Sequence, residues 1–175
     1  MVQYLAFIVG ALIVAMLIFA ATRPNTFRVE RTTRIAAPAE RIFALINDFH
    51  LWQKWTPYDK DPAMTKIYSG AASGVGAIYE WEGDAQVGKG TAQITESQPA
   101  SRITIKLDFI KPFEAHNIAE FTLKAGSDAT QLTWAMHGTQ GFMVKLMGLF
   151  FSMDKMVGKD FEIGLARIKA IAEAV

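Results

Sequence analysis

Three histidines are the side chains in this 175-residue chain best suited to metal binding or proton transfer. His50, His116 and His137 lie far apart in the sequence, without HxH, HExxH or nearby carboxylate spacing. Zinc sites and metalloprotease helices depend on such spacing. The chain has no cysteine, which removes one class of nucleophile, and no Ser-His-Asp arrangement is recognisable. We therefore expect no metal site and no cofactor, and we assign no catalytic residue.

Carboxylates near aromatic segments are the other candidates for chemistry. A buried carboxylate beside a cavity can act as a general acid or base. The candidates are Asp48, Asp59, Asp61, Glu80 and Glu82. The sequence defines no paired arrangement among them, so solvated or ion-paired carboxylates are the simpler interpretation.

A glycine-rich segment, Gly70-x-x-x-Gly74-x-Gly76, superficially resembles a phosphate-binding loop. Such a loop needs a following Lys-Ser/Thr and leads into a helix. This segment lacks the Lys-Ser/Thr pair and leads into a predicted strand, so we interpret it as a hairpin loop.

The elements that position these residues begin with a half-buried strand over residues 27–35. Phe27, Val29, Thr33 and Ile35 alternate there with polar side chains, and only Arg31 interrupts the apolar face. A helix is predicted after Ala36-Ala37-Pro38, since proline suits a first helical position. Asn47-Asp48 ends that helix and caps a short second helix over residues 49–55, which Pro57 stops.

The middle of the chain changes to a period of two, with turn signals at short intervals. This pattern predicts a meander of antiparallel strands. The predicted strands cover residues 64–68, 77–82, 90–97, 102–109, 116–124 and 129–137. The first strand brings the total to about seven.

The C-terminal third returns to helical spacing. Val157, Phe161, Leu165 and Ile168 step by three or four residues, which predicts a long amphipathic helix at the end of the chain. The preceding segment, residues 142–156, is rich in Met and Phe. It is interpreted either as the first turns of that helix or as a lid or interfacial segment, and Gly148 is expected to mark a bend or close approach.

The first 22 residues contain no Asp, Glu, Lys, Arg or His. The apolar run from Tyr4 to Ala21 would be about 27 Å long as a helix, close to the thickness of a bilayer core. A transmembrane anchor is favoured over a signal peptide, because no basic residue precedes the run, and over a buried core helix. Basic residues follow the run from Arg23 on, so we expect a single-pass membrane protein with its domain on the cytoplasmic side.

Length and charge constrain the rest of the chain. The predicted organisation is an anchor at residues 1–22, a short linker at 23–26 and one domain at 27–175. The 18 basic and 17 acidic residues nearly balance, and no basic patch indicates binding of nucleic acid. The oligomeric state is not predicted.

Several segments together resemble a known superfamily. They are Ile35 to Phe43, Ile46 to Phe49, Trp52 to Pro57, Gly74-Val75-Gly76 with Tyr79-Glu80-Trp81, and Gly158 to Leu165. In order and spacing the sequence from Phe27 to Val175 is similar to the START-related, helix-grip superfamily, also called SRPBCC or polyketide cyclase/dehydrase-like. The resemblance implies an α+β, helix-grip fold, in which a curved antiparallel sheet of about seven strands wraps around a long C-terminal helix. With the N-terminal transmembrane helix, this is the expected architecture.

The resemblance also implies a cavity between sheet and helix, because members bind lipids, sterols, hormones and polyketides and only some are enzymes. An ordinary solid core would have the same sequence pattern. The expected ligand-binding residues are Trp55, Tyr79, Trp81, Ile105, Leu107, Phe109, Phe121, Trp134, Met136, Phe150 and Phe161.

The expected function is membrane-tethered binding of a lipid or other hydrophobic small molecule, and the expected partners are that molecule and the membrane. The alternatives are a polyketide cyclase/dehydratase-like enzyme and a non-catalytic module that binds a partner.

Overall fold

The computed structural model describes residues 2–150 and 152–174. Residues 1, 151 and 175, which fall within predicted segments, lie outside the described residues. The elements, in chain order, are α1 (Val2–Thr22), β1 (Thr26–Ile35), α2 (Ala39–Asn47), the 3-10 helix η1 (Phe49–Lys54), β2 (Thr65–Gly70), β3 (Ala77–Glu82), β4 (Lys89–Gln98), β5 (Arg102–Lys111), β6 (Ala115–Ala125), β7 (Thr130–Thr139), α3 (Phe142–Met147) and α4 (Met153–Glu173).

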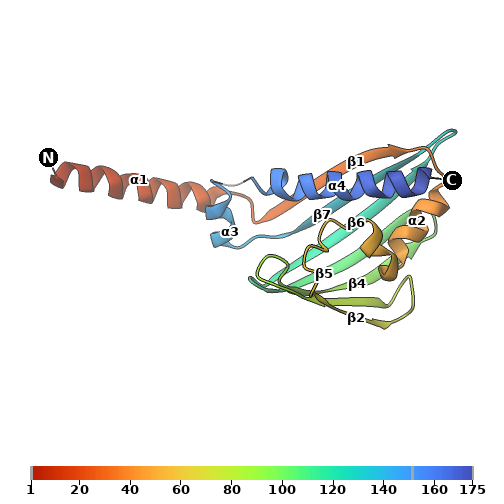
Figure 1. Ribbon diagram of the computed structural model, residues 1–175. Coiled ribbons are helices and arrows are strands. Elements are labelled where there is room, and N and C mark those ends of the chain that lie inside the picture. The colour runs from red at the N-terminus through yellow and green to blue at the C-terminus, as the bar shows by residue number, and fades with distance from the viewer. Residues whose placement is uncertain (1, 151, 175) are drawn as a thin grey trace.

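All seven strands form one antiparallel sheet in the order β1-β7-β6-β5-β4-β3-β2. The predicted strands are confirmed, with ends that differ by one or two residues. The glycine-rich segment is the β2–β3 hairpin loop, where the Ala71 N–H donates to the Gly76 carbonyl. Figure 1 shows the curved sheet with α4 lying along β1 and β7 on one face.

The interruption predicted at Arg31 has a structural explanation. Arg31 lies on the helix-facing side of β1 and donates from Nη1 and Nη2 to the Asp154 carboxylate at 3.0 Å, and from Nε to Glu162 at 2.9 Å. Its guanidinium crosses α4 at Gly158, where a Cβ would overlap it. A basic residue on an apolar face thus joins the first strand to the last helix.

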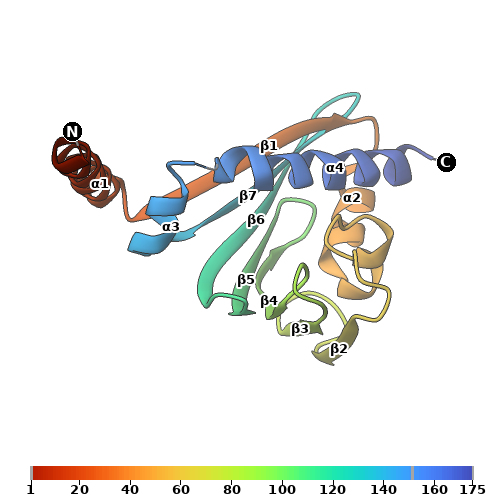
Figure 2. The same cartoon turned by 60° about the vertical axis from the view of Figure 1, so that its left-hand side comes forward.

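The helices α2 and η1 cover the same face of the sheet as α4. Pro38 is the N-cap of α2, so this helix begins at Ala39, and Ile42 and Ile46 face the core as predicted. Asp48 caps η1 by accepting a hydrogen bond from the His50 N–H at 2.8 Å. Figure 2 shows α2 and α4 together over one face of the sheet.

The Met- and Phe-rich segment forms a helix of its own. α3 ends at Met147 with Gly148 as its C-cap, and α4 begins only at Met153. The interpretation of residues 142–156 as the first turns of the closing helix is therefore wrong, although α4 does include residues 153–156. The bend expected at Gly148 is confirmed. α3 packs mainly against α1.

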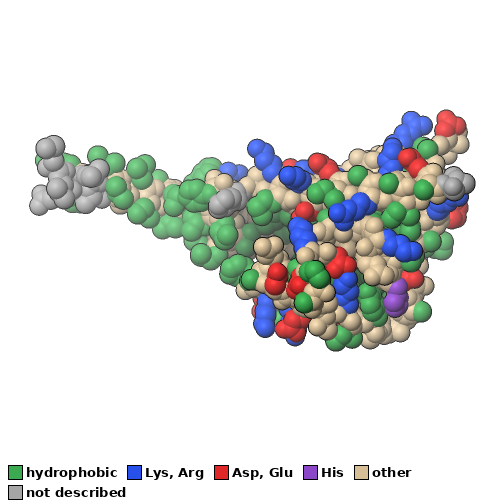
Figure 3. All heavy atoms as spheres, in the orientation of Figure 1, with side chains coloured by type: hydrophobic (Ala, Val, Ile, Leu, Met, Phe, Trp, Pro, Cys, Tyr) green, Lys and Arg blue, Asp and Glu red, His purple; other side chains and the backbone are tan. Residues whose placement is uncertain are grey.

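The N-terminal run is helical, as predicted, and α1 extends away from the rest of the chain (Figures 1 and 2). Most of its described apolar side chains from Tyr4 to Phe19 are exposed, as Figure 3 shows by the hydrophobic colour along this helix. Across the part of the chain that the structure describes, no helix combines the length and apolar character needed to cross a membrane. The transmembrane helix predicted for residues 1–22 is therefore not supported.

Candidate functional site: a cavity between the sheet and α4

A cavity of about 290 Å³ lies between the sheet and the helices that cover it. Strands β3 to β7 form one wall, and α4 forms another through Val157 and Phe161. The third wall is η1 with the loop that follows it. The lining is mostly apolar and aromatic, which is the usual character of small-molecule sites in proteins.

Small residues on the sheet leave room for the cavity. Ala92 on β4 and Ala119 on β6 are fully buried and both line it. Ala92 pairs with Leu107, and Ala119 pairs with Met136 on the neighbouring strand. Gly90 makes room for the ring of Trp81, which a Cβ at this position would overlap. Short side chains on β4 and β6 therefore contribute to the hollow.

An aromatic wall closes the cavity on the β2–β3 side. The ring of Tyr79 stacks on that of Tyr68 at 5.3 Å and on that of Trp81 at 5.7 Å between centroids. Trp81 in turn meets Phe109 edge to face at 5.8 Å. Such contacts add stability beyond the burial of area. This wall presents a continuous row of rings to anything inside the cavity.

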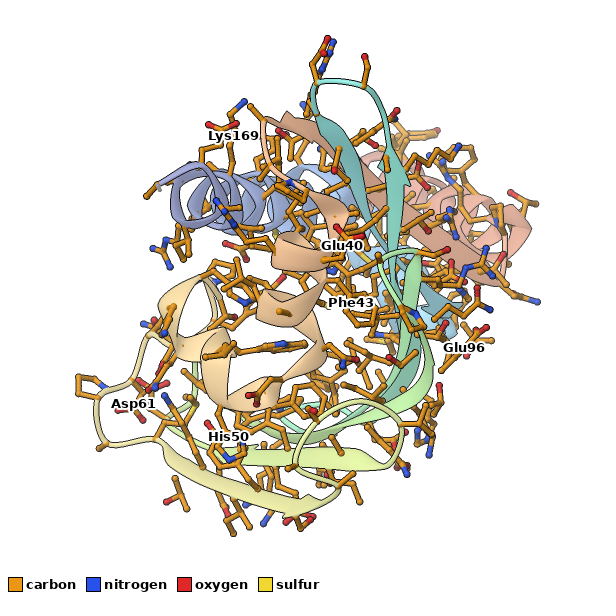
Figure 4. All side chains as sticks on the ribbon, turned by 90° about the vertical axis from the view of Figure 1, so that its right-hand side faces the viewer. Glu40, Phe43, His50, Asp61, Glu96 and Lys169 are labelled. Atoms are coloured by element: carbon orange, nitrogen blue, oxygen red, sulfur yellow. The ribbon has the colours of Figure 1, made fainter. Side chains whose placement is uncertain are left out.

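The loop after η1 is held at three points. Asp59 forms an ion pair with Lys66 on β2, and Lys60 lies 3.6 Å from Asp160 on α4. Asp61 accepts a hydrogen bond from the Asp84 N–H at 3.0 Å, which connects the loop to the β3–β4 hairpin. Figure 4 shows Asp61 on this loop at the outer edge of the domain. Asp59, Lys60 and Lys66 thus add charged groups to the lining on this side of the cavity, whereas the rest of the lining is mostly apolar.

Two tyrosines in the lining, Tyr58 and Tyr79, have hydroxyl groups with strongly raised pKa values. Tyr58 is 41% exposed as a whole residue, and local desolvation of its hydroxyl raises the pKa of that group above its ordinary value, with a smaller contribution from Asp160. Burial also raises the pKa of Tyr79, and Tyr68 and Asp59 add to the effect. Both hydroxyls therefore stay protonated at neutral pH, available as hydrogen-bond donors but not as bases.

The structure brings most of the predicted ligand-binding residues together. The eight that line the cavity are Tyr79, Trp81, Leu107, Phe109, Phe121, Trp134, Met136 and Phe161. Trp55 and Ile105 are fully buried in the solid part of the core instead. Trp55 points away because its Nε1–H donates to the Leu45 carbonyl at 2.9 Å. Phe150 is 68% exposed and follows α3, outside the cavity.

Sequence reasoning missed the wall formed by η1 and the following loop. The missed lining in this wall includes Phe49, Trp52, Tyr58 and Met64, and Tyr68 on β2 was missed as well. The aromatic content of residues 49–58 was a usable signal. A 3-10 helix and an irregular loop lack a fixed side-chain period, however, so the inward-facing residues were not assignable.

The histidines lie outside the lining. His50 bonds to Asp48 at 2.9 Å and stacks on Tyr68, at the position labelled in Figure 4. His116 bonds to Asp108 at 2.7 Å, which raises the pKa of His116. His137 lies 3.5 Å from Glu120. Within the described residues, no group of three or more His, Cys, Asp or Glu is arranged to hold a metal ion.

The geometry defines a class of protein: a helix-grip domain with an apolar internal cavity. Residues 26–173 match the family described as polyketide cyclase / dehydrase and lipid transport. The chain belongs to this family. No curated protein shows significant similarity to it in sequence.

Solved structures show the same fold at low identity. Protein CV1439 from Chromobacterium violaceum is 20% identical with a TM-score of 0.60, and the match covers 87% of this chain and 100% of that one. The di-domain ARO/CYC proteins BexL, from the BE-7585A biosynthetic pathway, and StfQ, from the steffimycin pathway, are 15% and 10% identical. Their TM-scores are 0.66 and 0.65, over 90% and 85% of this chain. The match spans about half of each di-domain protein, 54% and 51%.

Proposed function

We propose that this protein binds a hydrophobic small molecule, such as a lipid, in the cavity between the sheet and α4. The observation that carries the proposal is the 290 Å³ space lined by the rings of β3, β5, β7 and α4. A ligand that buries about 300 Å² of apolar surface would gain about 7.5 kcal/mol before ordering costs. Binding therefore needs no catalytic group.

The family description agrees with this proposal, because it includes lipid transport. The ARO/CYC neighbours have the same fold, in which the cavity of this chain lies between the sheet and α4. The predicted position of the domain on the cytoplasmic side of a membrane stays a prediction from the sequence.

The test uses the uncharged fluorescent probe N-phenyl-1-naphthylamine and the full chain. Energy transfer from Trp52 and Trp81 reports probe that lies in the cavity. Ala92→Leu adds three carbon atoms to the cavity and should weaken binding at least about tenfold. The matched control, Ala172→Leu, adds the same atoms to the solid part of the core and should leave probe affinity unchanged. Equal affinity of the wild type and Ala92→Leu would contradict the proposal.

A cyclase/dehydratase-like enzyme is the second candidate, and the specific observation for it is Asp59. This carboxylate lines the cavity beside Lys66 and the Tyr79 hydroxyl. An enzyme that relies on Asp59 for proton transfer should lose turnover of a poly-β-ketone substrate in Asp59→Asn while keeping probe affinity. Unchanged turnover in that variant would remove Asp59 from consideration.

A further inference from the structure

A large exposed apolar surface lies outside the cavity, on α1 and α3. We call it the α1–α3 surface and define it by the exposed residues Tyr4, Phe7, Ile8, Val9, Leu12, Ile13, Val14, Leu17, Ile18, Phe19, Phe142, Met143 and Met147. The two helices pack against each other, so their side chains form one continuous patch, visible in Figure 3. Exposed apolar patches of this extent mark interaction sites.

The exposure covers every face of α1. Phe7, Ile8 and Val9 are consecutive and are 79%, 58% and 47% exposed. Successive residues of an α-helix are rotated by about 100°, so three in a row cover all sides. The pattern repeats at residues 12–14 and 17–19. A helix that is apolar all round is stable only where apolar surroundings enclose it.

This geometry favours lipid over protein as the occupant. A second copy or a partner helix would cover one stripe of α1 and leave the other faces in water. The hydrocarbon region of a bilayer covers all faces at once. An exposed helix of this kind therefore fits lipid better than it fits one protein partner.

Basic groups lie where the apolar surface ends. Arg23 follows α1 directly, and its guanidinium lies 4.7 Å from the centre of the Phe19 ring. Lys145 on α3 is only 9% exposed, and among the described residues no acidic group lies within ion-pair distance of it. Long basic side chains keep their stems in apolar surroundings and extend their charges to lipid phosphates. A phosphate would supply the counter-charge that the described protein lacks at Lys145.

We propose that the α1–α3 surface binds the hydrocarbon region of a lipid bilayer, with Arg23 and Lys145 at the level of the headgroup phosphates. α4 starts soon after α3, and its Val157 lines the cavity. Binding through this surface would therefore hold the cavity close to the lipid. The docking itself does not depend on the proposed ligand.

The test is flotation of the full chain with vesicles of phosphatidylcholine, alone or mixed with phosphatidylglycerol. The wild type should float with both, and more strongly with the anionic mixture. Leu12→Glu with Ile13→Glu should lower the partition coefficient at least about tenfold, since charge is costly in hydrocarbon. Lys145→Gln should reduce the preference for anionic vesicles by about fivefold, the effect expected of one basic group.

The matched control removes apolar surface elsewhere. Ile67→Gln with Val75→Gln changes two side chains that are 52% and 59% exposed at the β2–β3 edge, and flotation should not change. Binding of N-phenyl-1-naphthylamine in the cavity checks that each variant is folded, and it separates failure of docking from failure of the proposed function. Wild type that stays in the aqueous fraction, or that forms a defined dimer and does not float, would overturn the proposal. Equal flotation of the double glutamate variant would also overturn it.

Discussion

The two ends of the space between the sheet and α4 have the same kind of sequence but different packing. At one end Ile103, Ile105 and Ile168 are fully buried in a solid core. At the other end Leu107, Phe109 and Phe161, on the same strand and helix, surround a cavity. The difference follows the cross-strand partners on β4, because Ala92 pairs with Leu107 at the cavity end and the larger Ile94 pairs with Ile105 at the solid end. Hollow and solid regions thus depend on side-chain volume and not on the apolar pattern.

The largest expected effect comes from truncation on β5. Ile105→Ala removes a fully buried side chain from the solid end and should lower the free energy of unfolding by about 2–5 kcal/mol. Leu107→Ala, two residues along the same face, enlarges an existing cavity and should cost about 1–2 kcal/mol. Urea unfolding measures both. Equal losses would mean that the two ends are packed alike.

Enlarging a side chain, instead of truncating it, should also distinguish the solid end of the core from the cavity end. Ala172→Leu adds carbon atoms to the solid core and should destabilise the protein by about 1–3 kcal/mol. Ala92→Leu enters a hollow and should change stability by less than about 1 kcal/mol. Thermal unfolding with van't Hoff analysis provides the comparison. A greater loss in Ala92→Leu would contradict the open cavity.

A third prediction concerns the ion pairs that join α4 to β1 at the cavity end. Arg31 lowers the pKa of Asp154, chiefly by hydrogen bonding. The ionised carboxylate is then favoured in the folded state, so this contribution to stability is present above the unfolded pKa, near 4, and is lost as the pH falls. Arg31→Met should therefore destabilise the protein more at pH 7 than at pH 3, as measured by urea unfolding.

The control is Arg28→Met, which changes an arginine on the opposite face of β1 with half-exposed ion pairs. Exposed pairs of this kind contribute little, so the effect of Arg28→Met should be small at both pH values. If Arg31→Met cost as much stability at pH 3 as at pH 7, the Arg31–Asp154 pair would have no part in the pH dependence.

The smallest expected effect on stability is that of Tyr79→Phe, a substitution in the cavity wall. Burial raises the pKa of its hydroxyl, so the neutral form is favoured in the folded state. The contribution to stability is complete below the unfolded pKa, near 10, and is lost as the pH rises above it. Tyr79→Phe should leave stability almost unchanged at pH 7 and remove one late-titrating tyrosine from the ultraviolet titration. Loss of an ordinary, early-titrating tyrosine instead would place Tyr79 in water.

Much of the fold was predictable because strands and the final helix have regular periods. The alternation of Ile103, Ile105, Leu107 and Phe109 defined β5 and its inward face. The same alternation does not distinguish Ile105 from Leu107, so the sequence predicted the lining on the sheet but not the point where the solid core ends. That point depends on the neighbouring strand β4, where Ala92 pairs with Leu107 and Ile94 pairs with Ile105.

The remaining differences involve irregular or short elements. Trp52 in η1 lines the cavity and Trp55, directly after η1, does not. Their indole N–H groups donate to different carbonyls of α2, Ile46 for Trp52 and Leu45 for Trp55. α3 packs on α1, and Phe150, which follows α3, is 68% exposed and does not line the cavity in which it was predicted. Neither contact has a periodic signal in the sequence.

The most direct test of the central claim is a methyl nuclear magnetic resonance titration of the full chain with N-phenyl-1-naphthylamine. The account predicts that the methyl signals of Leu107 and Met136 shift with probe concentration, because both line the cavity. The signals of Ile105 and Ile168, in the solid core, should stay in place. Shifts confined to Leu12, Leu17 and Met143 on the α1–α3 surface, with none at Leu107 or Met136, would contradict the account.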